Sequence, residues 1–219
     1  MDMAADALLF DMDGTLVDSS AAVRRCWTAW MGEYGLKSAD FARLFTHGRP
    51  AVEIIRDALP PAQLADGGLA AALHRIEDLE VSDVEGTVAL PGVRGLLESL
   101  PGDRWAVVTS ATRALAEVRL KVCGLSAPLL VAADDITRGK PDPEPFLLAA
   151  KLLGADPARC VVAEDAPAGL AAACAAGMRS IAVTTTHERA DLVADVVVDG
   201  LRRVSVTSGP AGLMVRVTT

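Results

Sequence analysis

The chain has 219 residues, of which 51% are hydrophobic and 23% are charged. This composition excludes disordered, collagen-like and coiled-coil chains, and it provides for a sizeable core in one domain or in a core with an insertion. The net charge of −8 at pH 7 would repel a polyanion, so we expect no binding to nucleic acid.

Export and membrane insertion are not indicated by the sequence. The N-terminus begins with acidic residues, unlike the basic start of a secretory signal. The longest uncharged apolar stretch, 166–178, is shorter than the roughly 20 residues that span a bilayer. The four cysteines are scattered without a close pair, which favours buried thiols in a reducing compartment. We therefore expect a cytoplasmic protein without a membrane partner.

In chain order, the first predicted elements are one buried strand at 8–10 and a long helical stretch. The stretch 19–88 contains no good strand. Its predicted helices cover 21–34, 40–44, 51–59, 63–64 and 69–79. Turn or capping residues stand at both limits of the stretch. We predict an α-helical domain of residues 19–88, inserted into a core formed by residues 1–18 and 89–219.

Beyond the predicted insertion, short apolar runs alternate with helical patterns. The strands are predicted at 106–109, 129–132, 160–163, 180–183 and 196–198, and the helices at 93–100, 113–123, 143–153 and 166–176. This alternation indicates a parallel sheet covered on both faces, so the predicted fold class is α/β, a doubly wound, Rossmann-like core. Two alternating segments, 204–207 and 213–218, predict a closing hairpin with a structural role.

Polar residues follow several of the predicted strands, at the edge where doubly wound sheets bind ligands. They are Asp11 and Asp13 after the first strand, Thr109 and Ser110 after the second, Lys140 beyond the third, and Glu164 and Asp165 after the fourth. One acid at a strand end is commonly a helix cap. Several polar ends at one sheet edge instead favour a shared site.

These residue types are the ones that phosphoryl transfer needs, because that reaction depends on positioning and on neutralising charge. An ionised Asp11 can attack phosphorus and form an aspartyl phosphate. Asp13 can protonate the leaving alkoxide and later accept a proton from the attacking water. Gly14 permits the tight turn between them and the following chain.

Clustered acids repel a phosphate unless a cation is present, and Mg²⁺ prefers one or two carboxylates, water and a phosphate oxygen. We predict Asp11 and Asp165 as carboxylate ligands, with Glu164 behind them or acting through water. Lys140 stands on a loop with two prolines and would pair with phosphate and nucleophile. Thr109 and Ser110 are predicted to contact the substrate, and the hydroxyl of Ser110 would bind a phosphoryl oxygen.

Four segments resemble, in the same order, the motifs of the haloacid dehalogenase-like hydrolase superfamily: 10–19, 108–110, 139–143 and 163–169. The resemblance implies that Asp11 is the nucleophile and Asp13 the acid/base, and that Ser110 and Lys140 hold the phosphate. It also implies that Asp165 binds Mg²⁺ and that the main-chain carbonyl of Asp13 completes the metal site. A helical cap between the first two motifs belongs to the same resemblance.

Within the superfamily, segments 89–93, 104–110 and 164–169 are most similar to small sugar- and polyol-phosphate phosphatases. Examples act on 2-deoxyglucose 6-phosphate or glycerol phosphate. His47, Gly48 and Arg49 resemble the specificity loop of those enzymes and are predicted to contact the substrate. Pro50 and Glu53 stand where a second arginine and an aspartate often occur. We expect a small phosphorylated metabolite as substrate and a monomer or weak dimer.

Other functions are weighed against the phosphatase. A phosphomutase of the β-phosphoglucomutase type uses the same core, but related mutases tend to carry an arginine where this chain has Ala51. A phospho-acceptor signalling receiver domain is a distant alternative, because receivers have no helical insertion and no use for Asp13. A dehalogenase is disfavoured because the superfamily's dehalogenases lack an acid at the position of Asp13.

Overall fold

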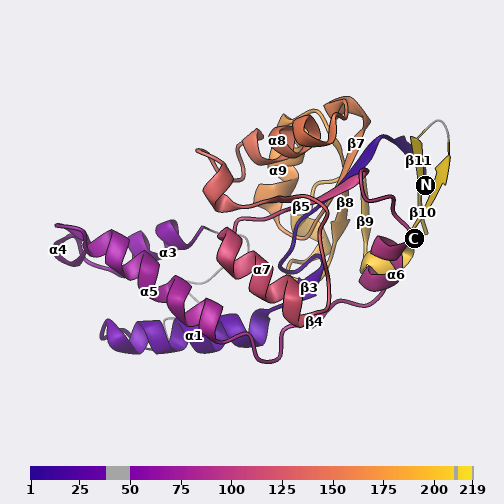
Figure 1. Cartoon of the computed structure of the whole chain (residues 1–219). Helices are drawn as coiled ribbons and strands as arrows, with labels where there is room; N and C mark the ends of the chain where they lie inside the picture. The colour runs from indigo at the N-terminus through magenta and orange to yellow at the C-terminus, as the bar shows by residue number, and fades with distance from the viewer. Residues whose placement is uncertain (38–49, 210–211, 219) are drawn as a thin grey trace.

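A six-stranded parallel sheet lies at the centre of the computed structural model, which describes residues 1–37, 50–209 and 212–218 (Figure 1). The strand order is β6-β5-β2-β7-β8-β9. The strands are β2 (Ala7–Phe10), β5 (Trp105–Val108), β6 (Leu130–Val131), β7 (Cys160–Glu164), β8 (Arg179–Val183) and β9 (Val196–Val198). The predicted α/β class with a doubly wound sheet is confirmed. Since β5 and β7 flank β2 on opposite sides, the chain reverses its direction of winding at β2.

Helices cover both faces of this sheet, which explains why its strands are mostly apolar. Leu8 and Phe10 of β2 pack on one face with helices α6 (Val93–Glu98) and α7 (Arg113–Val122). Ala7 and Leu9 pack on the other face with α8 (Glu144–Leu153) and α9 (Pro167–Ala175). Short 3-10 turns complete the connections: η2 (Ala133–Asp135), η3 (Pro157–Arg159), η4 (Arg189–Asp191) and η5 (Leu201–Arg203).

A helical segment extends to one side of the sheet (Figure 1). Its described helices are α1 (Ser20–Glu33), α3 (Ala51–Ala58), α4 (Pro61–Leu64) and α5 (Gly68–Ser82). They pack around an apolar cluster of their own, in which the Trp30 indole donates a hydrogen bond to the Ala72 carbonyl at 3.0 Å. The segment begins after β3 (Val17–Asp18) and ends before β4 (Val88–Ala89), and these two strands pair antiparallel. The helix predicted at 40–44 lies outside the described residues.

A second sheet joins the two ends of the chain. It contains β1 (Asp2–Ala5), β11 (Gly212–Val217) and β10 (Val204–Gly209), with β11 in the middle. The antiparallel pairing of β10 with β11 is the predicted hairpin. The pairing of β1 with β11 was not predicted, because a four-residue strand has too short a pattern to identify by itself.

The expectation of buried thiols needs one correction. Cys26, Cys123 and Cys160 are buried, whereas Cys174 is exposed. In α9 the two preceding alanines face the sheet, and the helical rotation turns the next residue away from it. Within the described residues, no helix is both long enough and apolar enough to cross a bilayer.

Candidate active site

The site lies at the carboxyl ends of the central strands, next to the point where the direction of winding reverses. Phe10, the last residue of β2, is in register with Val107 of β5 and Ala163 of β7, so the residues that follow these strands emerge side by side. One pocket is lined by all the core residues that the sequence predicts: Asp11, Asp13, Thr109, Ser110, Lys140, Glu164 and Asp165. The predicted cap contacts His47, Gly48 and Arg49 lie outside the described residues.

Lys140 is a buried cation that lines this pocket. Its Nζ donates hydrogen bonds to Asp11 Oδ1 at 2.6 Å, to Glu164 Oε1 at 2.9 Å and to the Val108 carbonyl at 3.0 Å. These contacts use all three donors of the ammonium group. Burial by itself would lower the pKa of Lys140, but the Asp11 and Glu164 carboxylates outweigh it and raise that pKa above its usual value. Lys140 therefore keeps its charge.

Glu164 is held entirely by the protein. Its Oε2 accepts hydrogen bonds from the backbone N–H groups of Asp165 at 2.8 Å and Ala166 at 2.7 Å, while Oε1 accepts from Lys140. Gly169 makes room for it, because a Cβ at that position would lie 1.7 Å from Glu164 Oε1. Since both of its oxygens are engaged by protein donors, Glu164 holds the Lys140 ammonium group in the pocket that both residues line.

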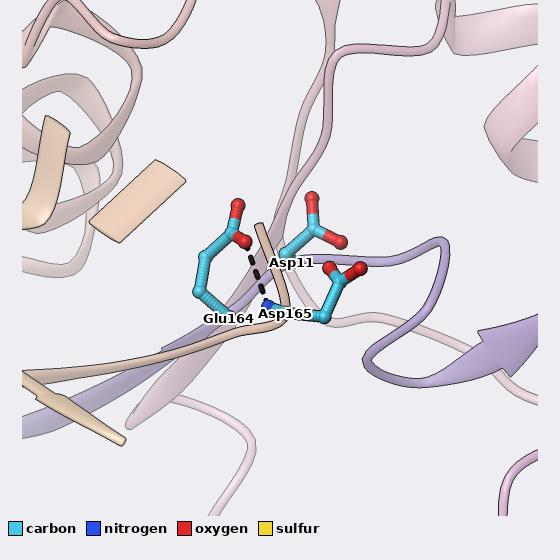
Figure 2. A group of neighbouring side chains, drawn as sticks. All are labelled: Asp11, Glu164 and Asp165. Atoms are coloured by element: carbon cyan, nitrogen blue, oxygen red, sulfur yellow. Dashed lines mark hydrogen bonds between the residues drawn. The ribbon is translucent and has the colours of Figure 1, made fainter. Parts of the chain in front are cut away.

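The carboxylates of Asp11, Glu164 and Asp165 gather at one point (Figure 2). One oxygen of each lies within 4.8 Å of the others. Burial raises the pKa of Asp11 well above its usual range, with further upward shifts from Glu164 and Asp165. Burial, and next the charge of Glu164, raise the pKa of Asp165 to about 7. Lys140 balances only one of these charges, so the cluster fits a divalent cation with a preference for oxygen ligands, as Mg²⁺ has.

Two threonines that the sequence analysis did not single out hold Asp165. Thr15 Oγ1 donates to Asp165 Oδ1 at 3.2 Å, and Thr186 Oγ1 donates to Asp165 Oδ2. Gly14 has a φ of +88°, and a Cβ there would lie 2.3 Å from Asp165 Oδ2, so the turn needs glycine for two reasons. Thr186 follows β8, so the rule that polar strand ends mark the site would have identified it.

Asp13 is also held at both oxygens. Ser19 Oγ donates to Asp13 Oδ1 at 2.6 Å, and Arg119 Nη1 donates to Asp13 Oδ2 at 2.9 Å. The same guanidinium contacts Glu80 Oε1 at 3.0 Å. Sequence reasoning missed Arg119 and Glu80, because each stands within a helix without a motif around it.

The two residues after β5 differ in their surroundings. Thr109 is buried, and its hydroxyl oxygen accepts a hydrogen bond from the Ala111 N–H at 3.1 Å. Ser110 is exposed and lines the pocket. The O–H group of each residue remains available as a donor, because accepting a hydrogen bond at the oxygen does not use the O–H. The arrangement can therefore offer a donor to an anion from either residue.

Comparison with known proteins identifies the family. The model of the haloacid dehalogenase-like hydrolases matches residues 5–177. Hexitol phosphatase A of Escherichia coli (strain K12) is 42% identical over 214 residues, which cover 96% of this chain and 98% of that protein. 2-Deoxyglucose-6-phosphate phosphatase 1 of Saccharomyces cerevisiae is 32% identical over 241 residues, with coverages of 99% and 96%.

The solved structures agree in fold. The crystal structure of CbbY from Rhodobacter sphaeroides in complex with phosphate superimposes with a TM-score of 0.73 at 27% identity, over 90% of this chain and 95% of that one. The resemblance inferred from the four motifs is thereby confirmed. The chain belongs to the haloacid dehalogenase-like hydrolase family.

Proposed function

We propose that this chain is a Mg²⁺-dependent phosphatase that hydrolyses phosphoric monoesters of small polyols and sugars through an aspartyl phosphate. The observation that carries the proposal is the buried Lys140, which binds Asp11 and Glu164 in the same pocket as Asp165. The hexitol phosphatase and 2-deoxyglucose-6-phosphate phosphatase relatives support a polyol or sugar phosphate as substrate.

In the first half-reaction Asp11 attacks phosphorus, and the bond from phosphorus to the ester oxygen breaks. Lys140 orients the Asp11 carboxylate through Oδ1, which leaves Oδ2 for the attack. Asp13 donates a proton to the departing alkoxide. Ser110 and Lys140 are the predicted contacts of the phosphoryl oxygens, and Lys140 would exchange one of its three present acceptors for phosphate. Asp11, Asp165 and the Asp13 carbonyl would hold Mg²⁺, which supplies positive charge next to the phosphoryl group.

In the second half-reaction water attacks the phosphorus of the aspartyl phosphate. Asp13, now ionised, accepts the proton of that water, and Asp11 leaves as a carboxylate with release of inorganic phosphate. Arg119 and Ser19 hold the Asp13 carboxylate at the edge of the same pocket. A single carboxylate thus serves as acid and then as base.

We assign choice of the leaving group to residues 19–88. Val23 and Trp27 of α1 and Ile54 of α3 line the same pocket as the carboxylates, so the helical segment contributes apolar side chains to it. His47, Gly48 and Arg49 remain predicted contacts. We expect this segment to act as a cap that closes over the core, with Ser19 and Val88 near the hinges. Structures determined with and without a phosphate analogue test closure, and identical cap positions would contradict it.

The proposed activity is tested with a panel of phosphorylated metabolites assayed for phosphate release, with Mg²⁺ and with a chelator. Hexitol, 2-deoxyglucose, glycerol and other sugar phosphates belong in the panel. We expect release from one or more of them that the chelator abolishes. If no member releases phosphate, the proposal fails. Glucose 1-phosphate is included with its products followed as isomers, since isomer formation without free phosphate would select a mutase instead.

A further inference from the structure

Arg119 joins three separate parts of the chain at the edge of the pocket. It stands on α7, it contacts Asp13 after β2 at 2.9 Å, and it contacts Glu80 of α5 at 3.0 Å. The Arg119 side chain is only 5% exposed and that of Glu80 only 12%. A buried guanidinium shared by two carboxylates is strongly held, because each removed partner would leave an unpaired charge.

The Arg119 guanidinium binds its two carboxylate partners through different nitrogens. In a bidentate pair, two nitrogens of one guanidinium donate to the same carboxylate. Here Nη1 goes to Asp13 and Nη2 to Glu80. The buried Nε has no hydrogen-bond partner among the described residues. Arg119 therefore donates to two carboxylates at once: that of Asp13, the predicted acid/base, and that of Glu80 on α5.

We propose that Arg119 is a positioning residue for Asp13 that links the acid/base carboxylate to the position of α5. This inference rests on the proposed phosphatase function and adds a residue to it. Asp13 must place an oxygen against the ester oxygen and later against water, and Arg119 determines where Asp13 Oδ2 lies. Because Glu80 binds the same guanidinium, a shift of α5 moves Arg119 and with it Asp13. The efficiency of proton transfer by Asp13 thereby depends on the position of the helical segment.

The test separates proton transfer from the rest of catalysis by changing the leaving group. Sorbitol 6-phosphate has an alkoxide leaving group that needs a proton, whereas p-nitrophenyl phosphate releases a stable phenolate that does not. We would measure the first turnover by rapid quench for both substrates, in the wild type, in Arg119→Met, Arg119→Lys and Glu80→Gln, and in the double variant Arg119→Met/Glu80→Gln. Arg113→Met is the matched control, because Arg113 stands on the same helix and pairs with Asp135 away from the pocket.

For Arg119→Met we expect the first turnover of sorbitol 6-phosphate to slow by about 10- to 100-fold, within the range of general acid catalysis. KM and the burst of p-nitrophenolate should stay within about threefold of the wild type. Arg119→Lys should recover part of the rate. Glu80→Gln should give a smaller loss that disappears in the Arg119→Met background, as expected for residues acting through one contact. Arg113→Met should behave as the wild type.

An equal loss of first-turnover rate with both substrates would overturn the inference, because it indicates a general disturbance of the site. A rise in KM alone would also overturn it, because it indicates that Arg119 contacts the substrate directly. If Arg119→Met does not fold, Glu80→Gln and Arg119→Lys decide by the same comparison. Failure of the proposed function is distinguishable, because the wild type itself would then release neither product.

Discussion

At the scale of single residues, Asp11 combines burial with a contact to a buried cation. Its Oδ1 accepts a hydrogen bond from Lys140 Nζ at 2.6 Å. We predict that Asp11→Asn, which preserves shape and removes the nucleophilic charge, lowers the rate of phosphate release by roughly 10³-fold or more. Phosphate assay and circular dichroism check the activity and the fold together. Turnover near that of the wild type would refute the assigned nucleophile.

Gly169 is a second residue whose identity matters for the site. A Cβ there would meet Glu164 Oε1 at 1.7 Å, so Gly169→Ala must displace the partner of Lys140. We expect a destabilisation of about 1–3 kcal/mol, as for other overpacked sites, and about tenfold slower turnover or worse. Chemical denaturation and phosphate release measure the two effects.

The control for this substitution is Gly95→Ala in α6, where the added Cβ would meet no atom within 4 Å among the described residues beyond its own helix backbone and its chain neighbours. Replacing that helical glycine should stabilise the protein by roughly 0.5–1 kcal/mol, with unchanged activity. If both alanine variants behave alike, the close approach of Gly169 to Glu164 has no consequence.

At the scale of secondary-structure elements, β11 illustrates how alternate residues of one strand differ in their role. Leu213 is buried in the main apolar cluster, whereas its neighbour Met214 is 40% exposed. We predict that Leu213→Ala lowers the free energy of unfolding by about 2–5 kcal/mol. Met214→Ala should change it by no more than about 0.5 kcal/mol.

Urea denaturation of the two variants measures this difference. The central position of β11, between β1 and β10, predicts that loss of Leu213 loosens both ends of the chain at once. Equal stability of the two variants would mean that the hairpin does not contribute to the core.

At the scale of the whole molecule, the buried acids make stability depend on pH and metal. Asp165 has a pKa of about 7 in the folded protein against its usual 3.8. Between these values the folded chain binds more protons than the unfolded chain, so without metal this group lowers the free energy of unfolding as pH rises from about 4 to about 7. Above that window its contribution is constant.

Mg²⁺ should therefore stabilise the protein most at high pH, because its ligands must be ionised. At about 100 times Kd we expect Tm to rise by roughly 5–10 °C near pH 8. Near pH 5.5 the rise should be smaller, because protons compete for Asp165. Thermal unfolding with Mg²⁺ and with chelator measures both, and Asp165→Asn should remove most of the effect. An equal rise at both pH values would contradict this account.

The sequence by itself determined the layers of the fold and the membership of the core site. Buried strands of a parallel sheet are continuous apolar runs, and ligands gather at their carboxyl ends. This rule predicts that the residues after the strands share one site, and Asp11, Asp13, Ser110, Lys140 and Asp165 do line one pocket.

Only the tertiary structure decided how these groups are held. Arg119 of α7 contacts both Asp13, which follows β2, and Glu80 of α5. The pairing of β1 with β11 likewise joins residues from the two ends of the chain. Such contacts connect residues far apart in sequence through packing of separate elements, and no local pattern of hydrophobicity or motif spacing encodes them.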